Sequence, residues 1–533
     1  MTSGNSTANR WDFATVLLLG GLLVTASALL PAFPVDETRY LTVAWEMRIT
    51  GNWSLPTLNF EPYSHKPPLL FWLINASWSV LGVAVWPARL VGAAATVLVL
   101  ILTHRLERLL APAQSSGPAL SVLMLLGLPL FLVLGCSIMF DMLLTMTVSG
   151  ALLALWIAGR SGDWRAFLAY GASIGLGLLA KGPVVLLFTV PAALLAPCWI
   201  APEHRRHWYL RIAAAIALGA LMGLAWALRA ASIGGAEYAE MLLWTQSAGR
   251  IASSFAHARP FWFYVPVLLL FCVPLLVWRP AWTSLRRSIK TATPGRNFLL
   301  SWFLPGLFGL SLISGKQIHY LLPVLPAVAL LVSLSLHHVE LRNADRFGWA
   351  VLAAGILLVL AVLAMVGRHL YTDDSALASI ATQLSLPGVL VTGALAVGAI
   401  ACFRGSAQRM LVGLAAANSI LLGSLTLQSR NGVAGLFDLQ PLANVMQRLR
   451  DRPIAVAQRT RGEFGFLARL NHPVDHVPET ELPSWFLRHP DGIAVIRCRS
   501  NAHNCDAPFP GRVLYRKEYR LQEIISIVSA SMN

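Results

Sequence analysis

The chain has 533 residues, of which 56% are hydrophobic and only 12% are charged, with a formal net charge of +16. Soluble domains carry about a quarter of charged residues, so a chain this apolar must bury surface in lipid, and a soluble globular protein is excluded. The excess of Lys and Arg would suit a nucleic acid. However, arginines between apolar segments are what the positive-inside rule produces, and we expect no nucleic-acid partner.

Apolar segments long enough to cross about 30 Å of hydrocarbon recur along the chain, which predicts a polytopic α-helical protein of the lipid bilayer. We predict about thirteen spans, near residues 12–31, 88–103, 117–135, 142–158, 166–180, 183–200, 210–228, 262–278, 297–314, 320–336, 348–367, 387–403 and 410–427. The first reads as an uncleaved span, because no small-residue cleavage site follows it. The stretch from Pro68 to Gly82 is apolar but short, and we expect it to lie along the interface.

Charge gives the orientation of these spans. With the N-terminus inside, every inside loop is basic, from Arg105 and Arg108 to Arg404 and Arg409. The unusual ionisable residues then gather at the outer face, around a long first outer loop at 32–87. Loops of that length are uncommon unless they are functional. A transporter would instead place such groups near the bilayer midplane.

The last hundred residues differ in composition from the rest. Residues 429–533 are more charged and contain short β-branched runs such as 453–456 and 493–496, which predicts a small α/β domain. The odd number of spans places it outside, beyond a transmembrane catalytic domain at 1–428. Cys498 and Cys505 lie in this stretch, either as a short-loop disulfide or as two thiols.

Asp36 opens the first outer loop directly after a proline-rich turn. Prolines end the first span, and the following residues have the spacing of a short helix lying on the membrane. Asp36 would lie near the N-cap of this helix, so it either caps the helix or acts as a catalytic carboxylate. Low dielectric beside lipid would strengthen its pull on a proton.

Several cations share the outer face with Asp36. Lys66 precedes two prolines, Lys181 and Lys316 each stand at a membrane boundary, and Tyr320 follows Lys316 at helical spacing. Each lysine alone could simply extend to lipid headgroups. Together they predict a cradle for a phosphate leaving group.

Asp141 and two histidines leave alternatives open. Asp141 begins a span, where it is either an N-cap or a second carboxylate of the site. His65 and His257 could share a metal ion, although they have no fixed local spacing, and an ordinary aromatic loop explains His257 as well.

Six segments carry a resemblance to a known family, and they occur in that family's order between residues 31 and 325. They are Asp36-Glu37-Thr38-Arg39-Tyr40, Lys66-Pro67-Pro68, Phe140-Asp141, Ala180-Lys181-Gly182-Pro183, Arg259-Pro260-Phe261-Trp262 and Lys316 through Tyr320. Together they resemble the bacterial aminoarabinose transferases of the GT-C, protein-O-mannosyltransferase-like superfamily. The resemblance implies a GT-C fold of about thirteen transmembrane helices with a periplasmic C-terminal domain.

The resemblance also implies roles for single residues. Asp36 would be the catalytic carboxylate, with Asp141 as a second acid. The substrate-binding set would comprise Arg39, Tyr40, Lys66, Lys181, Arg259, Lys316 and Tyr320, with Lys66 and Tyr320 on the carrier phosphate.

For a bound metal, the residues match the family only in part. His257 falls where relatives have a histidine near a metal, but His65 stands where relatives have Glu. A zinc site would therefore be built from two histidines or be absent.

The function implied is an inverting, integral-membrane glycosyltransferase of the bacterial inner membrane with its active site facing the periplasm. It would move 4-amino-4-deoxy-L-arabinose from undecaprenyl phosphate to a lipid A phosphate, giving resistance to polymyxin and cationic antimicrobial peptides. The alternative is another polyprenyl-phosphate sugar (galacturonic acid, hexose or mannose) or a protein or glycan acceptor. We expect a monomer.

Overall fold

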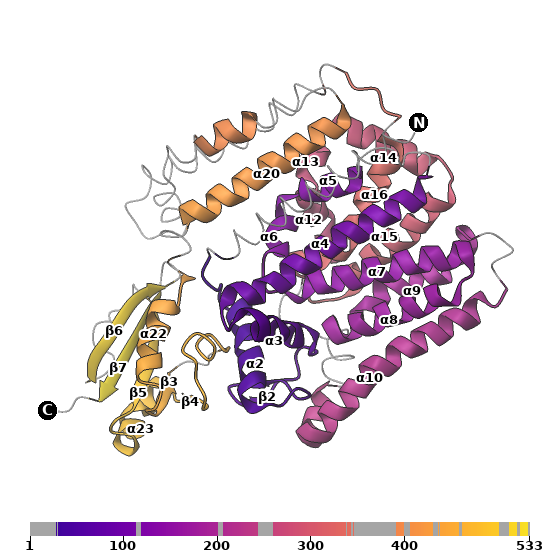
Figure 1. The fold of residues 1–533 in the computed structure, drawn as a ribbon. Coiled ribbons are helices and arrows are strands. Elements are labelled where there is room, and N and C mark those ends of the chain that lie inside the picture. The colour runs from indigo at the N-terminus through magenta and orange to yellow at the C-terminus, as the bar shows by residue number, and fades with distance from the viewer. Residues whose placement is uncertain are drawn as a thin grey trace.

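The computed structural model combines a bundle of apolar helices with a smaller α/β unit (Figure 1). It describes residues 28–336 apart from 29, 113–118, 201–205 and 243–258. Beyond residue 336 it describes 338–342, 345, 391–398, 406–429, 435, 437–457, 461–499, 511–519 and 523–530.

Residues 32–87, the predicted first outer loop, fold into two helices joined by a small hairpin. Helix α2 (Asp36–Thr50) ends at Gly51, whose φ of 70° is the left-handed conformation that glycine adopts without strain at a helix C-terminus. Strands β1 (Thr57–Leu58) and β2 (Glu61–Pro62) pair antiparallel, and helix α3 (Leu69–Leu81) follows. At 13 residues, α3 is too short to cross a bilayer, as expected from the sequence.

Long helices form the bundle and pack side by side, with α7 between α4 and α8, and α10 against α8. Their bounds are α4 (Val85–Leu110), α7 (Phe140–Ser161), α8 (Trp164–Lys181), α9 (Val184–Leu194), α10 (Trp208–Glu240), α15 (Pro294–Leu312), α16 (Leu325–Leu336) and α20 (Ala407–Ser429). Small residues allow close approach: a Cβ on Gly171 would lie 2.3 Å from the carbonyl oxygen of Ala215.

Shorter helices fill the gaps between these long ones. They are α5 (Leu120–Leu126), α6 (Pro129–Gly135), η2 (Ala196–Cys198), η5 (Phe261–Phe263), α12 (Tyr264–Phe271), α13 (Val273–Leu276), α14 (Arg279–Lys290) and η6 (Ile318–Val324). The predicted span at 117–135 is thus two short helices, because Pro129 lacks the N–H that would continue the first one.

Four helical segments of the described residues are long and apolar enough to cross a membrane: Val85–Leu110, Phe140–Ser161, Trp208–Glu240 and Ile318–Leu336. Helices also occupy the other predicted spans that fall within the described residues. The predicted spans at 12–31, 348–367 and 387–403 lie wholly or largely outside them, so the count of thirteen stays a prediction.

The C-terminal residues form an α/β unit around a five-stranded mixed sheet of order β4-β3-β5-β7-β6. Strand β3 runs parallel to β4 and β5, whereas β7 runs antiparallel to β5 and β6. The elements are α22 (Gln440–Arg448), β3 (Ile454–Val456), β4 (Asp475–His476), η7 (Glu479–Glu481), α23 (Leu482–Arg488), β5 (Ile493–Arg499), β6 (Gly511–Tyr519) and β7 (Glu523–Ala530). The α/β composition expected of this stretch is therefore observed.

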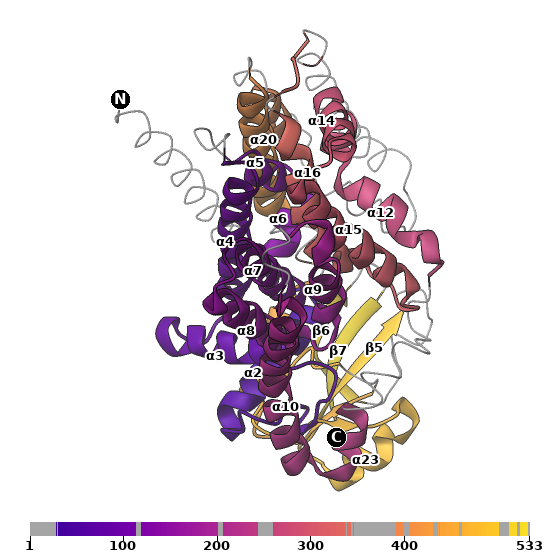
Figure 2. The same cartoon turned by 90° about the vertical axis from the view of Figure 1, so that its right-hand side faces the viewer.

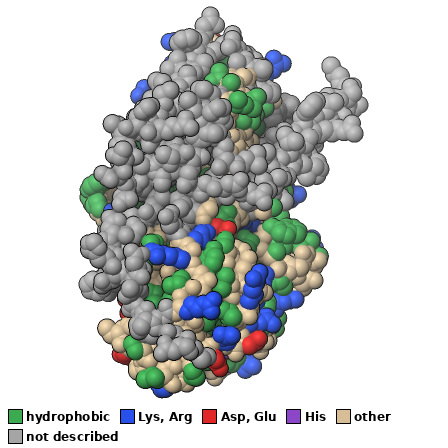
Figure 3. Space-filling view, turned by 90° about the vertical axis from the view of Figure 1, so that its left-hand side faces the viewer, with side chains coloured by type: hydrophobic (Ala, Val, Ile, Leu, Met, Phe, Trp, Pro, Cys, Tyr) green, Lys and Arg blue, Asp and Glu red, His purple; other side chains and the backbone are tan. Residues whose placement is uncertain are grey.

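This unit lies beside the first outer loop, next to α2 and α3 in both ribbon views (Figures 1 and 2). One of its faces is shown in Figure 3, where Lys and Arg side chains gather among apolar and neutral groups and outnumber the acidic ones. Cys498 is disulfide-bonded. Cys505, its predicted partner, lies outside the described residues.

Candidate functional site

Asp36 is the first residue of α2, and its side chain does not cap the helix. Val35 occupies the N-cap position and makes no side-chain capping hydrogen bond. The Asp36 carboxylate instead forms an ion pair with Arg39, and the Tyr40 hydroxyl donates to the same oxygen at 3.4 Å. The Asp36 side chain is 47% exposed. The carboxylate is thus oriented by its own helix and open to a reacting group.

The next residue, Glu37, fixes the entry of the chain into α2. Its carboxylate accepts hydrogen bonds from the backbone N–H of Phe33 and of Ile138, both at 2.9 Å. It also pairs with Arg89 of α4 at 2.5 Å. Arg89 in turn donates to the carbonyl oxygens of Leu30 and Pro31 at 2.6 Å. The buried pair therefore ties the start of α2 to α4 and to the turn before α7.

The second acid, Asp141, lies in the first turn of α7 and is buried. It is not the N-cap, a position that Met139 holds without a capping bond. It forms an ion pair with Lys181 at the end of α8, and Nε2 of His319 lies 3.6 Å from its other oxygen. A buried carboxylate paired with a lysine can orient that lysine toward a bound phosphate without taking part in the reaction.

Aromatic rings connect the two acids. The ring of Tyr40 packs edge-on against Phe140 with centroids 4.9 Å apart, and Nζ of Lys66 lies 5.4 Å from the centroid of the same Phe140 ring. On the other side of the site, Nζ of Lys181 lies 4.2 Å from the centroid of the Tyr320 ring. The structure therefore brings together seven of the predicted site residues: Asp36, Arg39, Tyr40, Lys66, Asp141, Lys181 and Tyr320.

Lys316 and Arg259 meet each other rather than the acids in the contacts of the described residues. Nζ of Lys316 is buried and donates to the carbonyl oxygens of Ile313 and Arg259, at 2.5 and 3.1 Å. The guanidinium of Arg259 lies 5.8 Å from the centroid of the Phe263 ring. Lys316 thus holds two loop segments together at this edge of the site.

The predicted metal residues are tested only in part. The ring of His65 stacks on Tyr63 with centroids 5.2 Å apart, and His257 lies outside the described residues. Within the described part of the chain, no group of three His, Cys, Asp or Glu side chains could hold a metal ion. The zinc hypothesis stays a prediction, and no step of the chemistry is assigned to a metal.

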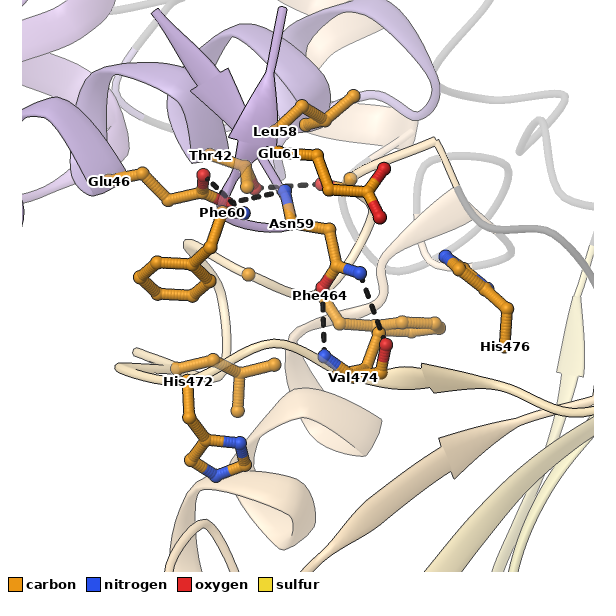
Figure 4. Close-up of a pocket in the computed structure, with 13 residues that line it drawn as sticks. Thr42, Glu46, Leu58, Asn59, Phe60, Glu61, Phe464, His472, Val474 and His476 are labelled. Atoms are coloured by element: carbon orange, nitrogen blue, oxygen red, sulfur yellow. Dashed lines mark hydrogen bonds between the residues drawn. The ribbon is translucent and has the colours of Figure 1, made fainter.

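A cavity of about 150 Å³ lies on another side of α2, between the hairpin and the C-terminal unit (Figure 4). Near it, the Glu46 carboxylate accepts hydrogen bonds from the Thr57 hydroxyl and from the backbone N–H of Asn59 and Phe60, at 2.7 to 2.9 Å. Both turn residues have positive φ, 56° and 62°, which is costly for Phe60. Glu46 therefore holds the hairpin turn in place. Burial raises the pKa of Glu46, and the three hydrogen bonds offset part of that rise.

Sequence reasoning did not assign roles to Arg89, His319 or Glu46. One feature of the sequence could have indicated a role for Arg89: it is a charged residue at the start of an otherwise apolar predicted span. His319 stands between two residues that were predicted, but its neighbour Asp141 comes from a helix far away in sequence. The role of Glu46 could not be predicted, because its partners belong to a turn 11 to 14 residues later.

Comparison with known proteins decides the family. The undecaprenyl phosphate-alpha-4-amino-4-deoxy-L-arabinose arabinosyl transferase of Pseudomonas paraeruginosa is 30% identical over 505 residues, covering 88% of this chain and 89% of that protein. The chain belongs to this arabinosyl transferase family. A Pectobacterium carotovorum member is 28% identical over 355 residues, 64% of this chain and 63% of that protein.

Two further matches agree with the arabinosyl transferase assignment. The profile of the dolichyl-phosphate-mannose-protein mannosyltransferase family matches residues 65–228. The crystal structure of ArnT from Cupriavidus metallidurans bound to undecaprenyl phosphate superposes with a TM-score of 0.80 over 98% of both chains, at 19% identity. The chain therefore has the GT-C fold of that structure and is a membrane glycosyltransferase, an enzyme, as predicted.

Proposed function

We propose that this arabinosyl transferase family member moves 4-amino-4-deoxy-L-arabinose from undecaprenyl phosphate to a lipid A phosphate on the periplasmic face of the bacterial inner membrane. The observation that carries the proposal is the Asp36 carboxylate, half-exposed at the start of α2. It is joined through Tyr40 and Phe140 to the buried pair of Asp141 and Lys181. The names of the curated relatives support the donor.

The proposed reaction is a single displacement. An oxygen of the acceptor phosphate attacks the anomeric carbon, and the bond from that carbon to the carrier phosphate breaks. Undecaprenyl phosphate leaves with the bonding electron pair, and the anomeric configuration inverts. Lys66 and Tyr320 hold the leaving phosphate, with Lys181 beside the Tyr320 ring, and oriented charge of this kind stabilises a transition state most.

Asp36 has a role that depends on the acceptor. A phosphate acceptor is already ionised, so Asp36 with Arg39 orients it and balances charge. A hydroxyl acceptor has to lose a proton as it attacks, and Asp36 would take that proton as general base. The phosphate acceptor is favoured by the Lys and Arg side chains on the C-terminal face, which attract an anionic glycolipid (Figure 3).

A second candidate is transfer of galacturonic acid from the same carrier. It is favoured by two lysines of the site, Lys66 beside the Phe140 ring and Lys181 beside the Tyr320 ring. The positive groups there suit a sugar carboxylate better than a sugar ammonium.

The test supplies the purified enzyme in liposomes with undecaprenyl phosphate carrying either sugar, together with lipid A, and detects the product by mass spectrometry. Aminoarabinose-modified lipid A is expected, and a product formed only from the galacturonic acid donor supports the second candidate. In cells, expression should raise the polymyxin concentration needed to stop growth, because the cationic sugar masks lipid A phosphates.

Asp36→Asn should lower the transfer rate by about a hundredfold, because it removes the charge that orients the acceptor and misplaced reacting atoms can cost that much. Binding of undecaprenyl phosphate should persist. The matched control is Asp451→Asn, at a C-terminal residue whose side chain is 91% exposed. Full transfer by Asp36→Asn would contradict the catalytic role.

A further inference from the structure

The face of α2 that carries Thr42 is bound to the C-terminal unit. The Thr42 hydroxyl donates to the carbonyl oxygen of Gly462 at 2.8 Å and accepts from the backbone N–H of Phe466 at 2.9 Å. One turn further, Nε1 of Trp45 donates to the carbonyl oxygen of Leu470 at 2.8 Å. Three hydrogen bonds therefore join α2 to the segment 461–474.

These contacts lie on the face of α2 opposite to Tyr40. With 3.6 residues per turn, Thr42 is rotated by about 200° from Tyr40 around the helix axis. The Tyr40 face packs on Phe140 of α7 and contacts Asp36. Helix α2 is therefore held between the site on one side and the segment 461–474 on the other.

Two glycines allow the segment to come this close. A Cβ on Gly465 would lie 2.4 Å from Cγ2 of Thr42, and one on Gly462 would lie 2.5 Å from Cδ1 of Leu58. Both distances are shorter than real Cβ atoms tolerate, and Gly462 also has a φ of 82°. The close approach therefore depends on glycine at both positions.

The hairpin and α3 are tied to the same segment. The side-chain amide of Asn59 accepts from the N–H of Val474 at 2.8 Å and donates to its carbonyl oxygen at 3.1 Å (Figure 4). Phe466 stacks on Trp78 of α3 with centroids 5.0 Å apart and nearly parallel rings. The segment thus contacts α2, the hairpin and α3.

We propose that the segment 461–474 acts as a brace that sets the position of α2 and hence of Asp36, with Thr42 as a positioning residue for sugar transfer. This proposal rests on the proposed catalytic role of Asp36. Helix α2 has 15 residues, a length at which an isolated helix is marginal in water, so tertiary contacts must hold it. A misplacement of about 1 Å can cost up to a hundredfold in rate.

The test compares Thr42→Val, which keeps the shape but removes the hydroxyl, with Thr42→Ser, which keeps the hydroxyl. Full-length enzyme in liposomes is assayed with the undecaprenyl-phosphate-linked sugar and lipid A. In Thr42→Val we expect kcat to fall about tenfold while KM for the donor stays within about twofold, because the carrier-phosphate residues are untouched. Thr42→Ser and the control Thr50→Val, whose hydroxyl bonds only near its own helix end, should stay within about twofold of the unaltered enzyme.

Hydrogen–deuterium exchange of the peptide covering 36–41 gives a readout that needs no activity. Thr42→Val should speed exchange there, and Thr50→Val should not. If Thr42→Val leaves the kcat of an active enzyme unchanged, the proposed brace is contradicted. If the unaltered enzyme transfers no sugar, the proposed function fails instead, and unchanged exchange in Thr42→Val still overturns the brace.

Discussion

Glu37 and Arg89 form an ion pair whose side chains are 5% and 2% exposed. The Glu37 carboxylate accepts from Arg89 and from the backbone N–H of Phe33 and Ile138. The Arg89 guanidinium also donates to the carbonyl oxygens of Leu30 and Pro31. Such a pair is costly to desolvate but costlier to break, because the remaining charge stays buried. It therefore keeps Asp36 at the edge of the bundle.

Glu37→Gln should lower the free energy of unfolding by about 3–5 kcal/mol, the usual cost of leaving one buried charge unpaired. Thermal unfolding in detergent measures it. The double variant Glu37→Gln with Arg89→Leu should recover part of the loss, because it removes the unpaired charge. A double variant less stable than the sum of both single variants would contradict this account.

The candidate site residues could be predicted from sequence, but the side chains that contact them could not. Asp36, Lys66, Asp141 and Lys181 each stand at a predicted membrane boundary, where charge is costly and stands out. Whether Asp36 or Asp141 capped its helix could not be decided from sequence. The answer lies in contacts such as that of Asp141 with Lys181, 40 residues away, which only the packing of α7 on α8 creates.

The hairpin β1–β2 is the element in which one side chain does most to fix the backbone. Glu46 receives three hydrogen bonds from the hairpin while burial raises its pKa above the ordinary value of 4.5. The folded state therefore holds a proton on Glu46 more tightly than the unfolded chain does. By linkage, this contribution to stability is complete below pH 4.5 and is lost as the pH rises through the raised pKa.

Glu46→Gln should remove that pH dependence of the melting temperature and also lower stability by about 1–3 kcal/mol, because an amide supplies only one acceptor oxygen where two are used. Melting curves between pH 4 and about 8 measure both effects. The matched control is Glu61→Gln, an exposed residue of the same hairpin that should keep the wild-type slope. An unchanged slope in Glu46→Gln would show that Glu46 does not carry the dependence.

Hydropathy predicted where helices exist more reliably than where they end. The predicted span 142–158 is helix α7 from Phe140 to Ser161, and 210–228 is α10, which runs to Glu240 with a kink at Gly235. Apolar composition reports immersion in lipid, whereas a helix continues outside lipid until a residue such as Gly162, with φ 66°, ends it. The same measure merged α5 and α6 across Pro129.

The molecule as a whole carries its predicted site and its C-terminal unit at one end of the helix bundle (Figures 1 and 2). The contact between residues 32–87 and the C-terminal unit could not be predicted, since the residues that meet are more than 400 positions apart. Charge asymmetry predicted only that both lie on the same side of the membrane. That side is still a prediction, and one thiol can test it.

Cys198 is a free, exposed cysteine at the end of η2, just after α9, and the charge rule places it on the inner side. A membrane-impermeant maleimide should label it in inverted vesicles and not in intact spheroplasts. Cys198→Ser is the control: labelling that disappears in this variant comes from Cys198 and not from another cysteine. Labelling of Cys198 in intact spheroplasts would reverse the orientation of the whole chain.

The bond between Thr42 and Gly462 joins residues 420 positions apart. At about 5–20 residues per second, the ribosome delivers the second partner roughly 20 to 80 s after the first. Tyr320 is the last residue assigned to sugar transfer, so a nascent chain carries all of these residues well before residues 461–474 can join α2. If the proposed brace holds, α2 reaches its working position only after residues 461–474 have been synthesised and have docked on it, so the site is completed late in biogenesis.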